Sequence, residues 1–193
     1  MENNEKLIKI NNLKTFFYID GGIIKAVNDI SFTIEKAKTL GVVGESGCGK
    51  SVTALSIIRL IASPPGKIVG GEIIYKGNNL LDLKPLEMRK IRGNDISMIF
   101  QEPMTSLNPV FTIGNQIEEA IKLHQNLSKN DIKNKTVEML QLVGISESLR
   151  RYGDYPHQLS GGMRQRVMIA MALACNPKLI IAEAGNFPDL AKF

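Results

Sequence analysis

The sequence predicts an α/β fold with a phosphate-binding core, and three observations support that prediction. The mostly apolar run at residues 39–43 leads into a glycine-rich loop, and helically spaced apolar residues follow over 50–62. Alternating apolar residues flank the Gly21-Gly22 pair, which is typical of strands joined by a turn. Residues 114–144 have a mainly helical pattern. We therefore expect an N-terminal antiparallel β layer, a strand–loop–helix core and an inserted α-helical lobe.

In the first half of the chain, each expected element has its own signal. Residues 7–34 predict short strands around the glycine pair, and the short apolar run at 39–43, which Gly44 follows, is typical of a buried strand. The helix over 50–62 is expected to stop at Pro64-Pro65-Gly66. Residues 72–75 predict a strand that ends at a Lys76-Gly77-Asn78 turn, and 96–100 predict another buried strand.

The second half is predicted to be mainly helical, with the lobe extending over about residues 103–166. Ser160-Gly161-Gly162 precedes a helix at 163–174 that is apolar on nearly all sides and is therefore expected to be buried. Asn176-Pro177 ends that helix, and 178–182 predict a last apolar strand. No regular pattern continues after Ala182. We expect one domain over residues 1–193.

Composition excludes several classes of protein. Hydrophobic residues make up 44% and charged residues 22%, which is the range of folded globular proteins. The formal net charge of +5 permits contact with anions. The cysteines, Cys48 and Cys175, form no metal-binding or disulfide pattern and suit a reducing cytoplasm. The N-terminus does not resemble a signal peptide, and the longest apolar run, 167–175, is shorter than a membrane span.

The strongest functional signal is a loop that fits the phosphate-binding pattern G-x-x-x-x-G-K-[ST] at every fixed position. Its glycines let backbone N–H groups turn inward toward phosphate oxygens at a helix N-terminus. Lys50 is expected to reach the β- and γ-phosphates, and the Ser51 hydroxyl to bind Mg²⁺. Cys48 is interpreted as a tolerated small residue, and the alternative is a glycine-rich turn without a ligand. The candidate binding residues are Gly44, Glu45, Ser46, Gly47, Cys48, Gly49, Lys50 and Ser51.

A second motif, Leu159-Ser160-Gly161-Gly162-Met163, resembles the signature motif of ATP-binding-cassette (ABC) ATPases. A serine hydroxyl and glycine amides at a helix start can bind an anion. The resemblance implies that Ser160, Gly161 and Gly162 cover the γ-phosphate of an ATP molecule held by the P-loop of a second subunit. The alternative is a serine that only caps the helix, followed by flexible glycines.

The stretch from Phe100 to Pro109 resembles the Q-loop of the same family. Together with Tyr155-Pro156-His157-Gln158, it is similar to the ATPases of oligopeptide, dipeptide and nickel importers, and the resemblance covers about residues 7–182. It implies that Gln101 contacts Mg²⁺ or water and senses a transmembrane partner. It also implies that an aromatic residue near the N-terminus stacks on adenine. Phe17 and Tyr18 are both candidates, and both are alternatively ordinary strand residues.

The last apolar strand resembles the family's Walker B strand, which ends in Asp-Glu, whereas here Glu183 and Ala184 follow it. In one register Glu183 takes the metal-side position and Ala184 that of the catalytic Glu. In the register shifted by one, Glu183 is the base and the metal-side Asp is missing. Either way, one carboxylate stands where the mechanism uses two, one for the metal and one to polarise the attacking water.

The family's switch histidine has no counterpart, because no histidine follows His157. We therefore expect a chain truncated after the Walker B strand, with the C-terminal part of the fold missing.

The resemblance implies an ATP-binding subunit of a di- or oligopeptide importer that uses ATP and Mg²⁺ to drive a separate membrane permease, with hydrolysis defective in this chain. One P-loop and one signature motif imply a second ATPase subunit, and an extracytoplasmic substrate-binding protein would take part indirectly. The expected location is the cytoplasmic face of the cell membrane, with no nucleic acid partner. The alternatives are a non-hydrolytic ATP-binding remnant without a transport role and a DNA-associated ABC-type ATPase, which would bind DNA in a salt-dependent way.

Overall fold

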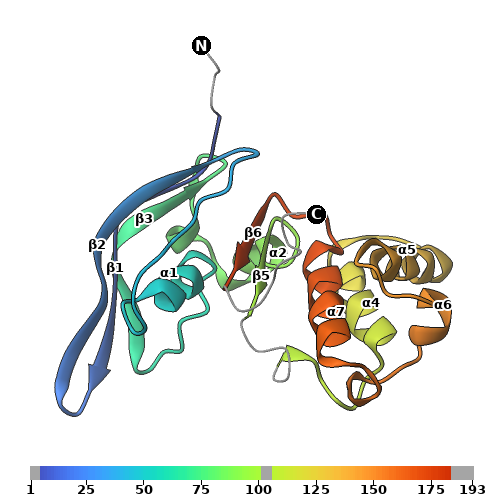
Figure 1. Ribbon diagram of the computed structural model, residues 1–193. Coiled ribbons are helices and arrows are strands. Elements are labelled where there is room, and N and C mark those ends of the chain that lie inside the picture. The colour runs from blue at the N-terminus through green and yellow to red at the C-terminus, as the bar shows by residue number, and fades with distance from the viewer. Residues whose placement is uncertain (1–4, 101–105, 184–193) are drawn as a thin grey trace. The chain divides into compact units, whose positions relative to one another are not determined.

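The chain forms two compact units, Met1–Arg89 and Lys90–Phe193. The computed structural model describes residues 5–100 and 106–183. The first unit is built on a β-sheet, whereas the second consists mainly of helices (Figure 1). The predicted α/β class, with an antiparallel β layer at the N-terminus, is confirmed. Within the described ranges, no helix has the length and apolar character that crossing a membrane requires.

The sheet of the first unit is antiparallel and has the strand order β2-β1-β3-β4. Strands β1 and β2 form one hairpin that turns where Ile19 pairs with Gly22, so the turn predicted at the glycine pair is confirmed. Each of these strands has 14 residues and is longer than the sequence pattern predicted. The strands are β1 (Lys6–Ile19), β2 (Gly22–Glu35), β3 (Gly66–Tyr75) and β4 (Asn78–Asn79).

Helix α1 (Lys50–Ile57) is joined to the sheet by a buried hydrogen bond. The hydroxyl oxygens of Thr15 in β1 and Ser56 in α1 lie 2.8 Å apart, and both side chains are buried. The helix ends earlier than predicted, and Arg59 just beyond it has a positive φ of 53°. The Arg59 guanidinium donates to the carbonyl oxygens of Leu80 at 2.9 Å and Leu83 at 2.6 Å. These bonds connect the end of α1 to η1 (Leu80–Asp82), which α2 (Pro85–Ile91) follows.

The prediction of a buried strand at residues 39–43 is wrong. These residues belong to neither sheet of the structure. Their side chains are not buried either, since Leu40 and Val42 are exposed and Val43 is 92% exposed. A strand requires neighbours for its N–H and C=O groups, and no described strand pairs with this segment. Apolar composition alone does not supply such a neighbour.

The second unit combines a short parallel sheet with a group of helices. Strands β5 (Ile96–Ile99) and β6 (Leu179–Ala182) pair in parallel, with Ile99 opposite Ala182. Both strands lie within the ranges that the sequence predicted. The helices are α4 (Ile113–His124), α5 (Lys129–Leu142), α6 (Ser148–Arg151), η2 (Pro156–Gln158) and α7 (Gly161–Leu173).

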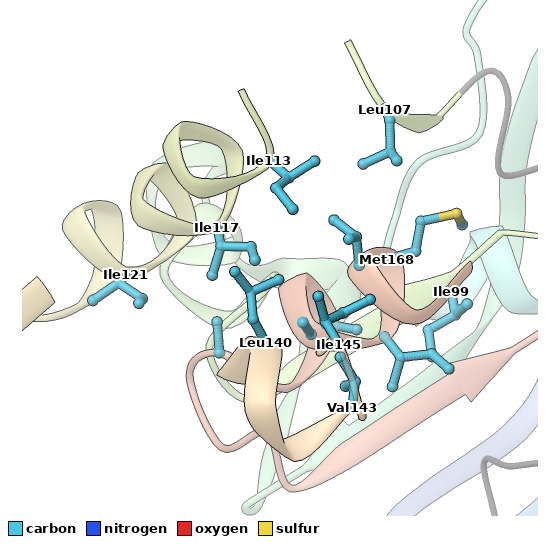
Figure 2. Close-up of a cluster of buried hydrophobic side chains, with 14 of the residues drawn as sticks. Ile99, Leu107, Ile113, Ile117, Ile121, Leu140, Val143, Ile145 and Met168 are labelled. Atoms are coloured by element: carbon cyan, nitrogen blue, oxygen red, sulfur yellow. The ribbon is translucent and has the colours of Figure 1, made fainter. Parts of the chain in front are cut away.

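The helices of this unit meet in one hydrophobic core. Ile113, Ile117 and Ile121 recur at every fourth position of α4, and all three are fully buried. Figure 2 shows these side chains on one side of α4, with Leu140 and Met168 from other helices in the same cluster. Helix α7 buries residues on several sides, as its apolar composition predicted. Ile99 belongs to this cluster as well, so the core joins the helices to β5.

A polar cluster fixes α4 to the residues after α6. Glu118, which is only 6% exposed, accepts a short hydrogen bond from the Tyr152 hydroxyl and another from Lys122 Nζ at 2.6 Å. Burial acts to raise the pKa of Glu118, but the hydrogen bonds from Lys122 and Tyr152 outweigh it, so this pKa lies below its usual value. Burial, and then the hydrogen bond to Glu118, raises the pKa of Tyr152 to about 12.

Candidate nucleotide-binding site

The glycine-rich loop ends at Gly49, which is the N-cap of α1 and has a left-handed conformation with φ 95° and ψ 5°. Any side chain is strained in this conformation. A Cβ atom at Gly49 would also collide with the backbone carbonyl oxygen of Ala26 in β2. Two independent constraints therefore require glycine here, and the loop lies directly against β2 at Ala26.

Lys50, the first residue of α1, folds back over the loop. Its Nζ donates to the carbonyl oxygens of Gly44 and Glu45, both at 2.6 Å, and lies 3.6 Å from Cys48 Sγ. A strong positive charge is thus held at the loop by neutral carbonyl groups. Phosphate oxygens are stronger acceptors for an ammonium group than carbonyls are, so an anion in the loop can compete for Lys50.

Ser51 is exposed in the first turn of α1, a turn that contains no acidic residue. The N-terminus of a helix carries unpaired N–H groups and a partial positive charge, which favour an anion. The loop, Lys50 and the helix start therefore form a site suited to the phosphates of a nucleotide. The sequence-predicted residues Gly44 to Ser51 all lie in this one segment.

The β1–β2 hairpin carries three aromatic residues, and each has different surroundings. Phe17, opposite Gly66 in β3, packs closely against it, since a Cβ atom at Gly66 would lie 2.9 Å from the Phe17 ring. Tyr18 is exposed near the turn. Phe16, which the sequence reasoning missed, pairs with Lys25, the neighbour of Ala26. Counting outward in pairs from the Gly21-Gly22 turn would have found it.

The second motif forms the start of α7. Ser160 is the N-cap, and its Oγ accepts a hydrogen bond from Met163 N at 3.3 Å. Gly161 and Gly162 are exposed, and a Cβ atom at either position would meet nothing within 4 Å. Packing within the chain therefore does not require these glycines. They leave the helix start open to an approaching group.

Glu183 directly follows β6, and its backbone N–H donates to the carbonyl of Ile99 at 3.0 Å. Its Oε1 is buried and has no hydrogen-bond partner among the described residues. Such an oxygen suits a bound metal ion or a water molecule. The predicted residue Gln101 and the neighbouring Ala184 lie outside the described residues. In the described part of the chain, no cluster of three metal-ligating side chains occurs.

Comparison with known proteins agrees with these features. Residues 27–183 match the ABC transporter family. A probable peptide ABC transporter ATP-binding protein of Sinorhizobium fredii is 52% identical over 95% of this chain and 56% of its own length. An oligopeptide transport ATP-binding protein of Bacillus subtilis is 52% identical over 92% of this chain and 54% of its own length. The chain thus spans little more than half the length of these curated relatives.

Among solved structures, a dimeric ATP-binding cassette in a post-hydrolysis state with ADP and phosphate is similar, with a TM-score of 0.79 and 30% identity. The match covers 91% of this chain and 72% of that one. The P-loop at the start of α1, the open serine–glycine start of α7 and these similarities lead to one conclusion: the chain belongs to the ABC transporter family, as an ATPase domain.

Proposed function

We propose that this chain is the ATP-binding subunit of an importer for di- or oligopeptides. The P-loop carries this proposal, because Lys50 and the N-terminus of α1 offer a cation and N–H donors within one loop. The names of the peptide-transport relatives support the substrate class. When ATP binds, the Lys50 ammonium would leave the carbonyl oxygens of Gly44 and Glu45 and bind the terminal phosphates.

Mg²⁺ would be held by oxygen donors of this chain. The exposed Ser51 hydroxyl is an oxygen donor of the kind that Mg²⁺ accepts, and the family resemblance predicts Gln101 as another. When bound, the ion would neutralise phosphate charge and orient the phosphates. Glu183 is followed by Ala184, so we propose that nucleotide is bound well and hydrolysed poorly.

The proposed partners are a second ATPase subunit, a membrane permease and, indirectly, an extracytoplasmic binding protein, which would place the chain at the cytoplasmic face of the membrane. The dimeric cassette structure supports the first partner.

As the surface that contacts the permease, we propose a hollow of about 430 Å³ on the surface of α4. Phe111 and Leu123 line it and are exposed, as is neighbouring Val110. Apolar surface of this kind is typical of an interface.

Three measurements test the proposal. Calorimetry in the presence of Mg²⁺ should detect ATP binding to the purified chain. The binding should be weaker in Lys50→Ala. Phosphate release should stay at the level of Lys50→Ala, and turnover well above that level would contradict poor hydrolysis.

The permease surface is tested by co-expression with peptide-importer permease subunits. Phe111→Ser should reduce co-purification with these subunits. Leu149→Ser, which changes an exposed leucine on α6, should not.

A further inference from the structure

Two lysines flank the Phe16 ring on one face of the sheet. Phe16 in β1 pairs with Lys25 in β2 on one side and with Lys67 in β3 on the other. Directly paired residues of neighbouring strands share a face of the sheet. Both lysines are exposed, and Lys25 Nζ lies 5.8 Å from the centre of the Phe16 ring.

The two lysines differ in their position relative to the P-loop. Ala26 follows Lys25, and its carbonyl is the group that Gly49 approaches so closely that a Cβ atom would collide with it. Lys25 therefore lies beside the contact between the sheet and the phosphate-binding loop. Lys67 lies on β3, and β1 separates this strand from β2. Lys25 is thus on the strand that the P-loop contacts, whereas Lys67 is two strands away from it.

The Lys25 ammonium is free to change partners. Within the described residues Lys25 forms no ion pair, and the nearest acidic residue along β2, Asp29, is paired with Lys14 at 3.8 Å. The contact with Phe16 is an exposed cation–π interaction, which is weak. An ammonium on a flexible four-carbon stem gains more from a phosphate oxygen than from an exposed ring.

We propose that Lys25 is a nucleotide-binding residue, whose ammonium contacts the phosphate nearest the ribose while the base stacks on Phe16. This inference rests on the nucleotide-binding function proposed above. On binding, Lys25 leaves the face of the Phe16 ring and so exposes it to the base. The same residue thus covers the ring in the free chain and holds the phosphate in the complex.

The test is calorimetric titration of the full chain with ATP and with ADP. Lys25→Met should weaken both by the same factor, about 3- to 10-fold, because both nucleotides carry the ribose-proximal phosphate. Lys67→Met is the matched control, since it removes an equal charge from the other flank of Phe16, and its affinity should equal that of the wild type. Lys25→Arg should retain most of the affinity. Thermal unfolding of each variant shows that it is folded.

Each other outcome overturns the inference. Equal losses in Lys25→Met and Lys67→Met would reveal a general effect of charge. A loss for ATP alone would move the contact to the γ-phosphate. Unchanged affinity in Lys25→Met, with the wild type binding ATP, would refute the role of Lys25 and leave the proposed function intact. If neither the wild type nor Lys50→Ala bound ATP or ADP, the proposed function would fail, and the role of Lys25 with it.

Discussion

Lys50 Nζ lies 2.6 Å from the carbonyl oxygen of Gly44, the first residue of the phosphate-binding loop. The cation that the nucleotide site requires is therefore already held at the loop by the loop's own backbone. Binding exchanges these carbonyl bonds for bonds to phosphate, and the lysine does not have to be brought in from solvent. Both states of the loop depend on the same side chain.

Lys50→Ala should weaken ATP binding by about 2–3 kcal/mol, the scale for loss of a hydrogen bond to a charged group. Calorimetry on the purified chain measures this. Lys38→Ala, which removes an exposed lysine before the loop, is the matched control and should leave the affinity unchanged. Equal affinity in Lys50→Ala and the wild type would contradict the role of Lys50.

Gly49→Ala and Gly161→Ala should differ strongly in folding stability, although both replace a motif glycine. At Gly49 the new methyl group meets the Ala26 carbonyl in a left-handed conformation, so unfolding should become easier by at least about 1–2 kcal/mol. At Gly161 the space is open and the backbone helical, so stability should be equal or higher by about 0.4–1 kcal/mol. Urea titrations compare them, and a similar loss in both would be against this account.

Tyr152→Phe removes the hydroxyl that donates to buried Glu118 and should destabilise the chain by about 1.5–3 kcal/mol. The raised pKa of Tyr152, about 12, means that the folded state favours the protonated phenol. The stabilisation is therefore complete below the unfolded pKa of about 10 and is lost as the pH rises toward 12. The difference in unfolding temperature between wild type and variant should shrink over that range, and a constant difference would disprove the linkage.

The stability that Glu118 contributes depends on pH in the opposite direction, since it is lost as the pH falls. The lowered pKa of Glu118 favours its carboxylate in the folded state. Its contribution is present above the unfolded pKa of a glutamate and is lost as the pH falls through the lower folded value. Glu118→Gln should therefore flatten the loss of stability in acid, relative to the exposed control Glu119→Gln. Parallel acid denaturation curves for the two variants would show that Glu118 is not responsible.

Gln116→Met should loosen the loop that carries Phe111. The buried Gln116 side chain accepts from Asn108 N at 2.9 Å and donates to the carbonyls of Asn108 and Phe111, both at 3.0 Å. Methionine fills a similar volume but leaves these groups without partners, at a cost of about 1–3 kcal/mol. Amide hydrogen exchange of Asn108 should accelerate while that of the α7 backbone stays slow. Unchanged exchange at Asn108 would show that the Gln116 side chain does not hold this loop in place.

The β1–β2 turn and the second-unit strands were predictable from the sequence because their signals are local. The Gly21-Gly22 pair marks the hairpin turn, and the apolar runs of β5 and β6 match their observed ranges closely. Residues 39–43 show where such reasoning fails, because a strand also needs a neighbour that lies elsewhere in the chain. A short apolar run therefore predicted the strands β5 and β6 correctly but predicted a strand at residues 39–43 that the structure does not contain.

The residues of the candidate site also differ in whether a local sequence pattern reveals them. The P-loop and the start of α7 were predictable because each is one continuous motif with a fixed spacing. Phe16 was missed because its pairing with Lys25, the neighbour of the Ala26 that lies against Gly49, depends on cross-strand register and not on a local pattern. The polar cluster of Glu118 and Tyr152 also joins residues far apart in the sequence, and no local pattern marks it.

The exposed segment at residues 39–43 has a consequence for handling the protein. Exposed apolar side chains on a segment that pairs with no described strand can template strand formation between molecules. The isolated chain should therefore aggregate as its concentration rises, and the process should begin immediately before the phosphate-binding loop. A lysine in place of Val43, the most exposed apolar side chain of the segment, should keep the chain monodisperse in light scattering at higher concentrations.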